Sequence, residues 1–335
     1  MKKLIEIKNN KPKLLKLMYD LGNTCNYKCW YCFPGSNTGT DPFPDVEVVK
    51  YNLVRILDYY YENGINEIQL NFLGGEPTLW ADLGTLIEYV SNNVKRDPKK
   101  HQLRITMQTN GSRTLRWWKE YGQYFDHVSV SVHHERVDVD HVCKVADILI
   151  EKKVSFLATV LMDHSAWDKC RSLVDRLIEY KTKFIVLAKP IHVNGEVNYT
   201  EEQREYLNVA RKKNPSLYQI WEHLDKWSKL PKYTAIFDDG TKENVRTDHY
   251  FIMNMLNRFK GWECTLSINW LQIMRDGNLT GTCRQKLFGL DYYYNINDPD
   301  FINKFNPTLQ PVICEQTMCT CAGEAVLTKK APNVN

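Results

Sequence analysis

Short apolar runs alternate with amphipathic segments from residue 14 to about residue 192. Six runs are rich in β-branched residues and have the length of strands, namely Leu14–Leu21, Glu67–Leu73, Leu103–Thr109, His127–His133, Ser155–Met162 and Phe184–Pro190. Apolar residues recur at helical spacing between them, in Val46–Asn63, Leu79–Val94, Leu115–Tyr124, Val139–Lys152 and Ala166–Lys181. Repeated strand–helix units predict an α/β fold with a parallel sheet. The pattern alone leaves open whether this sheet is doubly wound or an incomplete barrel.

The pattern changes after about residue 195, where charged and aromatic residues become more frequent. We expect helices at Tyr199–Lys213, Ser216–Lys229 and His249–Lys260. Turn-forming residues 238–240 and 275–278 predict two hairpins, the first of Tyr233–Phe237 with Asn244–Thr247 and the second of Thr265–Met274 with Leu279–Thr282. The chain therefore divides into residues 1–195, a connecting region 196–260 and a C-terminal part 261–335.

The composition of the 335 residues is that of a packed globular protein, with 43% hydrophobic and 25% charged residues. The formal net charge of +4 is small and the basic residues are scattered, so nucleic acid is not indicated as a partner. No run approaches the roughly 20 apolar residues that span a bilayer. Because the first ten residues have charges on both sides of a very short apolar run, we expect no targeting segment and a cytoplasmic chain.

Ten cysteines are distributed unevenly along the chain. Three lie within residues 25–32, five lie between residues 264 and 321, and only Cys143 and Cys170 fall between these groups. Those two occupy the apolar stripes of expected helices, so we interpret them as small core residues. Without a signal peptide, metal ligation is favoured over disulfide bonds for the two groups.

The first group has the spacing C-x3-C-x2-C, formed by Cys25, Cys29 and Cys32, and it directly follows the first expected strand. Active sites gather at the carboxyl ends of parallel strands. Three thiolates can hold one face of an iron–sulfur cube and leave the fourth iron open, whereas a zinc site with an added histidine and unliganded buried cysteines are the alternatives. The spacing, with an aromatic Tyr31 before the last cysteine, resembles the signature of the radical S-adenosylmethionine (SAM) superfamily.

That resemblance assigns cofactor contacts to the ends of later strands. Gly74-Gly75-Glu76-Pro77 ends the second strand and resembles the family's glycine-rich motif for the amino group of SAM, with Glu76 bringing a negative charge near it. An ordinary turn is the alternative. The fifth strand ends in Thr159, Met162 and Asp163 without the glycine-rich pattern of some family members, so contacts to the adenine are not assigned.

The third and fourth strand ends carry further polar residues that the resemblance implies face the cofactor or substrate. They are Thr109 and Asn110, preceded by Gln108, and Ser131, which is similar to the ribose-contacting position. His133 and His134 are candidate substrate contacts. Adjacent strand residues point to opposite faces, so we expect only one histidine in the site. Capping of the strand ends is the alternative for all these residues.

The second cysteine group resembles the twitch or SPASM extension of the same superfamily. Cys264 precedes the second expected hairpin, Cys283 ends it, and Cys314, Cys319 and Cys321 follow. The full SPASM pattern has seven cysteines, so five favour a single auxiliary cluster of the twitch type. Four ligands suffice for one cluster, which leaves one cysteine over, and structural zinc is the alternative.

The resemblance implies a partial (βα)6 barrel of the TIM type with a C-terminal α+β cluster-binding extension. It also implies a 4Fe-4S cluster, SAM as cofactor, a second iron–sulfur cluster and an electron donor such as flavodoxin or ferredoxin. In this family SAM is cleaved to a 5'-deoxyadenosyl radical that takes a substrate hydrogen, and an auxiliary cluster favours net oxidation or cross-linking of a peptide or small molecule. A glycyl-radical activase and a non-catalytic zinc-binding regulatory protein are the alternative functions.

Overall fold

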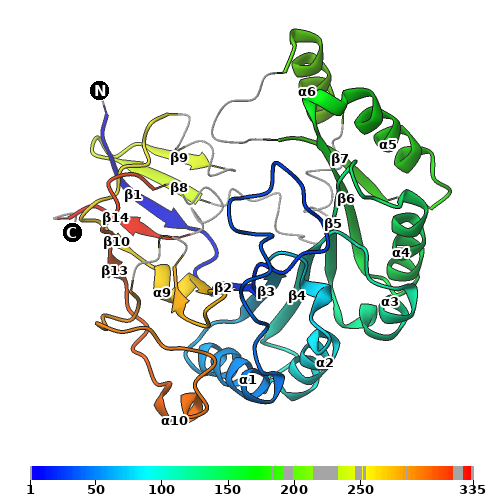
Figure 1. Ribbon diagram of the computed structural model, residues 1–335. Coiled ribbons are helices and arrows are strands. Elements are labelled where there is room, and N and C mark those ends of the chain that lie inside the picture. Colours follow the sequence, from blue (N-terminus) through cyan, green and yellow to red (C-terminus); the bar gives the residue numbers. More distant parts are fainter. Residues whose placement is uncertain are drawn as a thin grey trace.

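The computed structural model describes residues 2–182, 184–191, 199–213, 233–245, 251, 254–281, 283, 286–319 and 327–332. Two sheets organise this part of the chain, an eight-stranded sheet covered by helices and a six-stranded sheet beside it (Figure 1). No helix among the described residues has both the length and the apolar character that crossing a membrane requires.

The eight-stranded sheet contains the six predicted parallel strands in chain order. They are β2 (Leu14–Asp20), β3 (Glu67–Leu73), β4 (Gln102–Thr109), β5 (His127–Val132), β6 (Ser155–Met162) and β7 (Ile185–Pro190). A doubly wound sheet would reverse its strand order at a switch point, and this sheet has none. The sheet curves with its helices along the outer side (Figure 1) and β7 and β12 are its edges, so it forms an incomplete barrel.

The predicted helices between these strands are confirmed with slightly shorter bounds. They are α1 (Val46–Glu62), α2 (Leu83–Asn93), α3 (Leu115–Tyr121), α4 (Val139–Glu151) and α5 (Trp167–Glu179), with α6 (Glu201–Lys213) after β7. Short 3-10 turns replace some predicted helical ends, at η1 (Pro77–Leu79), η2 (Gly122–Tyr124) and η3 (His164–Ala166). Cys143 on α4 and Cys170 on α5 are buried in the core, as the apolar stripes predicted.

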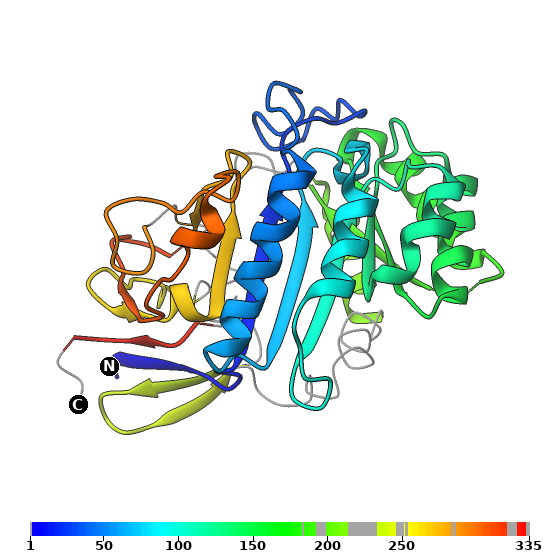
Figure 2. The same cartoon turned by 90° about the horizontal axis from the view of Figure 1, so that it is seen from below.

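The six-stranded sheet was only partly predicted, and it joins the two ends of the chain. Its order is β13-β10-β14-β1-β8-β9, and all its pairs are antiparallel. The strands are β1 (Leu4–Asn9), β8 (Tyr233–Phe237), β9 (Lys242–Val245), β10 (Glu263–Cys264), β13 (Val312–Ile313) and β14 (Lys329–Lys330). Figure 2 shows β1 lying between β14 and the β8–β9 hairpin. The sequence did not predict β1, because its apolar run is short and flanked by charges.

The second expected hairpin forms, but its first strand was predicted too long. Residues Leu266–Asn269 form the short helix α9, and β11 (Trp270–Ile273) pairs antiparallel with β12 (Leu279–Thr280). Asn269 holds this turn against the barrel, because its side-chain amide donates to the Pro12 and Leu14 carbonyls at 2.8 and 2.9 Å. β11 also pairs parallel with β2, so the hairpin extends the barrel sheet.

Two other predicted C-terminal helices have different outcomes, and one helix appears that was not predicted. The helix expected at His249–Lys260 is wrong for residues 254–260, which are turn and irregular backbone, and most of its remainder lies outside the described residues. The helix expected at Ser216–Lys229 also lies outside them. A short helix that was not expected, α10 (Phe301–Lys304), packs against α1, where Phe305 contacts Tyr59 with ring centroids 5.3 Å apart.

Candidate functional site

The loop that carries Cys25, Cys29 and Cys32 leaves the carboxyl end of β2 and is held by backbone contacts to the end of β3. Gly75 N–H donates to the Gly22 carbonyl at 2.7 Å, and Glu76 N–H donates to the Thr24 carbonyl at 2.8 Å. These two bonds place the residue before Cys25 directly against the Gly74-Gly75 turn.

The side chain of Asn23 closes this loop on itself. Its amide nitrogen donates to the hydroxyl oxygens of Thr38 and Thr40 at 2.7 and 2.9 Å, and its carbonyl oxygen accepts from Asp41 N–H at 2.9 Å. Arg275, from the β11–β12 turn, holds the same loop from outside, because it donates to the Gly35 carbonyl at 3.1 Å and pairs with Asp41 at 3.3 Å. The cysteine loop is thus fixed at both of its ends.

The two glycines are required where these loops meet. A Cβ on Gly75 would lie 2.3 Å from the Thr24 carbonyl oxygen, and one on Gly74 would lie 2.8 Å from the Gly22 carbonyl oxygen. Gly74 also has φ of +149°, a conformation that side chains rarely adopt. The close approach that demands glycine here is therefore to the cysteine loop.

A cavity of about 280 Å³ opens between this loop and the carboxyl ends of the parallel strands. It is close in size to the lower end of small-molecule sites, which measure about 300 to 1,000 Å³. Most of the lining residues are those that the sequence predicted: Cys25, Cys29, Tyr31, Cys32, Gly74, Gly75, Gln108, Thr109, Asn110, Ser131 and His133.

Sequence reasoning missed four lining residues, Tyr27, Asn37, Leu73 and Leu161. Leu73 and Leu161 lie at the ends of predicted strands, and Tyr27 lies inside the cysteine motif, so their positions could have indicated them. Asn37 carries no such signal. At the end of β6 it is Leu161 that lines the cavity, rather than Thr159, Met162 or Asp163.

Glu76 and Pro77 are near the cavity but are not among the residues that line it. The Glu76 carboxylate is 1% exposed and accepts four hydrogen bonds within the protein. The donors are Thr78 N–H at 3.1 Å, the Thr78 hydroxyl at 2.6 Å, the Thr109 hydroxyl at 2.7 Å and Asn110 N–H at 2.6 Å. Burial raises the pKa of Glu76 and these bonds oppose that shift. The Glu76 carboxylate therefore links the ends of β3 and β4. Its contact with the cofactor stays a prediction.

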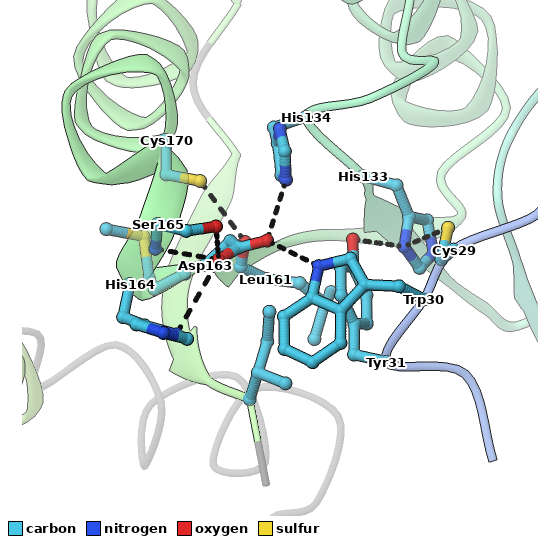
Figure 3. Close-up of polar contacts among 12 residues, drawn as sticks. Cys29, Trp30, Tyr31, His133, His134, Leu161, Asp163, His164, Ser165 and Cys170 are labelled. Carbon is cyan, nitrogen blue, oxygen red and sulfur yellow. Dashed lines mark hydrogen bonds and ion pairs between the residues drawn. The ribbon is translucent and has the colours of Figure 1, made fainter. Parts of the chain in front are cut away.

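The two adjacent histidines after β5 separate, as their alternation predicted (Figure 3). His133 Nδ1 lies 3.0 Å from the Tyr31 hydroxyl and 3.3 Å from Cys29 Sγ, and its ring stacks on Tyr31 with centroids 5.8 Å apart. Burial lowers the pKa of His133 to about 4, so its ring is neutral near pH 7. His134 turns away to Asp163, 3.1 Å from its carboxylate.

Asp163 anchors the middle of the cysteine motif to the barrel (Figure 3). Its carboxylate accepts from the Trp30 indole N–H at 2.8 Å and from the backbone and hydroxyl of Ser165 at 2.8 and 2.7 Å. Burial alone would raise the pKa of Asp163, but the bonds from Ser165, Trp30 and His134 together lower it to about 2. The carboxylate is therefore charged at neutral pH and holds Trp30 in place between Cys29 and Tyr31.

The chemistry of the three thiols fits a metal cluster with an open coordination position. Burial raises the pKa of Cys25 and Cys32, and that of Cys29 to about 12, so the thiols keep their protons until a metal displaces them. Across the described ranges, no three Cys, His, Asp or Glu side chains are placed to hold a metal ion as they stand. Yet the three thiols share one cavity with polar strand ends, which leaves room for a ligand beside them.

Three of the five C-terminal cysteines gather around one buried lysine. Cys264 on β10 lies opposite Lys329 on β14, with Lys329 Nζ 3.1 Å from Cys264 Sγ. Burial lowers the pKa of Lys329, but Cys264, Cys319 and Cys314 outweigh this and raise it. Cys283 follows β12 and Cys321 lies outside the described residues. The role of all five cysteines as ligands stays a prediction.

Two backbone contacts hold the other two cysteines at this place. Cys314 N–H donates to the Trp262 carbonyl at 2.8 Å, two residues before Cys264. Cys319 N–H donates to the Asn257 carbonyl at 2.8 Å, and the Asn257 side chain returns a bond to the Cys319 carbonyl at 2.9 Å.

Comparison with known proteins agrees with this geometry. Residues 19–176 match the family model of the radical SAM superfamily, so this part of the chain is a radical SAM superfamily domain. A GTP 3',8-cyclase of Aeromonas hydrophila subsp. hydrophila is 29% identical over 124 residues, which cover 34% of this chain and 33% of that protein. The S-adenosylmethionine-dependent nucleotide dehydratase RSAD2 of Oncorhynchus mykiss is 30% identical over 117 residues, covering 34% of this chain and 30% of the relative. The chain thus spans about a third of the length of these curated relatives.

Solved structures support the fold. The structure of a histidine-tagged form of anSMEcpe with bound AdoMet has a TM-score of 0.50 and 18% identity, over 85% of this chain and 78% of that one. At this identity the likeness concerns the fold alone. The predicted α/β fold with a parallel sheet is confirmed, residues 19–176 match the model of the predicted superfamily, and the twitch or SPASM extension stays a prediction.

Proposed function

We propose that this protein is a radical SAM enzyme that holds a 4Fe-4S cluster on Cys25, Cys29 and Cys32 and binds SAM in the adjoining cavity. One observation carries the proposal: the three thiols line the same cavity as the Gly74-Gly75 turn and the polar ends of β4 and β5. When bound together, the cluster and SAM supply a 5'-deoxyadenosyl radical that removes a hydrogen atom from a substrate.

The Gly74-Gly75 turn has a restricted set of groups to offer the cofactor. The N–H groups of Gly75 and Glu76 are already bonded to the cysteine loop, and the Glu76 carboxylate is bonded to Thr78, Thr109 and Asn110. Carbonyl oxygens of this turn are therefore the acceptors that we assign to the amino group of SAM. Ser131 and Asn110, which also line the cavity, are assigned to the ribose side.

We assign His133 and Tyr31 to the surroundings of the first cluster rather than to the substrate. Both are close to Cys29, because His133 Nδ1 lies 3.3 Å from the sulfur and 3.0 Å from the Tyr31 hydroxyl. A neutral imidazole or phenol can donate a hydrogen bond to a cluster thiolate, and such partners orient ligands and tune the metal. His134 is bonded to Asp163, which leaves it a positioning role for the loop through Trp30.

The C-terminal cysteines, Cys264, Cys283, Cys314, Cys319 and Cys321, are proposed to hold a second iron–sulfur cluster that takes an electron during net oxidation or cross-linking. The support is that Cys264 Sγ contacts buried Lys329 and that Cys314 is bonded through its backbone to Trp262, two residues before Cys264. Flavodoxin or ferredoxin is the proposed electron donor, and the cytoplasm is the proposed location. We propose to divide the chain at residues 195 and 260. The N-terminal and C-terminal parts contribute strands to the same sheets, since β1 pairs with β14 and β2 pairs with β11.

The substrate class is proposed as a peptide or a small molecule. Both relatives are named for reactions on GTP or on nucleotides, although each matches only about a third of this chain. Nucleoside triphosphates therefore come first among small molecules to be tested, and pools of short peptides form the second set.

The test of this function is the formation of 5'-deoxyadenosine by anaerobically reconstituted protein with a chemical reductant and SAM. Addition of a substrate should raise the rate above the uncoupled rate, and nucleotides and peptides are compared at equal concentration. Ser131→Ala is the matched site variant and should weaken the affinity for SAM without loss of iron. Protein that is fully loaded with iron yet forms no 5'-deoxyadenosine under any condition would contradict the proposal.

A further inference from the structure

Lys329 is a buried lysine whose burial the sequence does not predict. It is 3% exposed, whereas its neighbour Lys330 on the same strand is partly exposed, because alternate residues of β14 face opposite sides of the sheet. The register of the sheet sets Lys329 between Cys264 on β10 and Ile7 on β1. Its side chain therefore points into the packed face of this sheet.

The groups that face the Lys329 ammonium are sulfur atoms and an aromatic ring. Cys264 Sγ accepts a hydrogen bond from Lys329 Nζ at 3.1 Å, and Cys314 is bonded through its backbone N–H to the carbonyl of Trp262, two residues before Cys264. The Phe259 ring lies beneath it with Nζ 5.2 Å from the centroid. No carboxylate of the described residues forms an ion pair with Lys329.

A buried ammonium is costly unless an opposite charge compensates it. The neutral thiol of Cys264 does not supply that charge, since a thiol is only a weak acceptor. Thiolates bound to a metal do supply it, because ligation removes the thiol protons and leaves the site with negative charge. The burial of Lys329 among these cysteines is therefore explained when the cysteines carry a metal centre.

We propose that Lys329 is a positioning residue of the C-terminal cluster, where its ammonium donates an N–H···S hydrogen bond to the Cys264 ligand and stabilises the reduced, more negative state of the cluster. Hydrogen bonds to cluster sulfurs and nearby charge are established determinants of reduction potential. The inference rests on the proposed second cluster. It adds the residue that makes this cluster a better electron acceptor.

The experiment uses the full chain with Cys25, Cys29 and Cys32 replaced by Ala, so that the C-terminal site is the one that holds iron. Lys329→Met, whose unbranched side chain is one heavy atom shorter and carries no charge, is compared with Lys330→Met, the control on the opposite side of the same strand. Both are reconstituted anaerobically, analysed for iron and titrated reductively under electron paramagnetic resonance.

We expect Lys329→Met to keep its iron and to show an equilibrium constant for one-electron reduction at least tenfold lower, which is a potential about 59 mV more negative. Lys330→Met should keep the potential of the parent. Iron retained with an unchanged potential in Lys329→Met would overturn the role of Lys329 and leave the second cluster standing.

Two further outcomes separate the remaining possibilities. In the first, Lys329→Met loses iron and Lys330→Met does not. Lys329→Arg, which restores the positive charge, must then recover the iron. If it does not, Lys329 has only a packing role and the inference is overturned. If the parent variant itself binds no iron, the second cluster of the proposed function is wrong and the inference falls with it, while the first cluster remains open to its own test.

Discussion

Replacing Gly75 by Ala would place a methyl group against the backbone of the cysteine loop. The added Cβ would lie 2.3 Å from the Thr24 carbonyl oxygen and 2.9 Å from the Asn23 carbonyl carbon, whereas ordinary contacts of a Cβ begin at 3.4 Å. Both contacts are with backbone, so no flexible side chain can move aside. The two loops must therefore separate by about 1 Å.

That separation lowers the stability of the fold because it lengthens two hydrogen bonds. The hydrogen bonds from Gly75 N–H to the Gly22 carbonyl and from Glu76 N–H to the Thr24 carbonyl, now 2.7 and 2.8 Å, would lengthen beyond normal hydrogen-bonding distance. Each is worth about 0.5 to 1.5 kcal/mol, and overpacking adds about 1 to 3 kcal/mol. We expect Gly75→Ala to lower the free energy of unfolding by about 3 kcal/mol. Because Thr24 precedes Cys25, iron loading should fall together with the affinity for SAM.

The assay combines denaturant unfolding of the metal-free protein, iron analysis after anaerobic reconstitution and calorimetric titration with SAM. Gly35→Asn is the control in the same loop, because a Cβ there meets nothing within 4 Å and asparagine tolerates its φ of +78°. The reasoning is refuted if Gly75→Ala keeps full stability and full iron and loses only affinity for SAM. That result would mean that Gly75 faces the cofactor directly.

Three further predictions concern the hydrogen bonds of the Glu76 carboxylate, the second cluster and the radical step. Glu76→Gln keeps the oxygen that accepts from Thr78 and Thr109 but sets an amide NH2 against Asn110 N–H, so denaturant unfolding should show a free energy of unfolding lower by about 2 kcal/mol. Unchanged stability with weaker SAM binding would instead indicate that Glu76 contacts the cofactor. Replacing Cys283 and Cys319 by Ala should leave slow cleavage of SAM without product, and intact product formation would exclude a redox role for the second group. Deuterium at the reacting carbon of a substrate should appear in the methyl group of 5'-deoxyadenosine, with about one SAM consumed per product, and its absence there would contradict direct hydrogen abstraction.

The strands of the barrel were predictable because their pattern is local. Glu67–Leu73 and Ser155–Met162 agree with the structure at both ends, since apolar and β-branched residues begin and stop there. The same rule predicted most of the cavity, because carboxyl ends of parallel strands meet at one edge and bring Asn110, Ser131 and His133 together with the cysteines.

The features that were missed depend on partners far away in the chain. The bonds of Glu76 to Thr109 and Asn110, 33 and 34 residues later, could not be predicted from the motif. The strand β1 exists because β8 and β14 pair with it on both sides. Lys329 belongs to a pair of lysines that resembles an exposed charged end, and only the sheet register with Cys264 buries one of them.

The most direct test of the central claim is the iron content and SAM cleavage of the variant with Cys25, Cys29 and Cys32 replaced by Ala. Cys143→Ala, in the core of α4, is the matched control, because it removes a buried cysteine far from either group in the sequence. We expect about eight irons per chain in the reconstituted protein and in the control, about half in the triple variant, and no 5'-deoxyadenosine from the triple variant. Cleavage of SAM by the triple variant at the normal rate would contradict the assignment of the site.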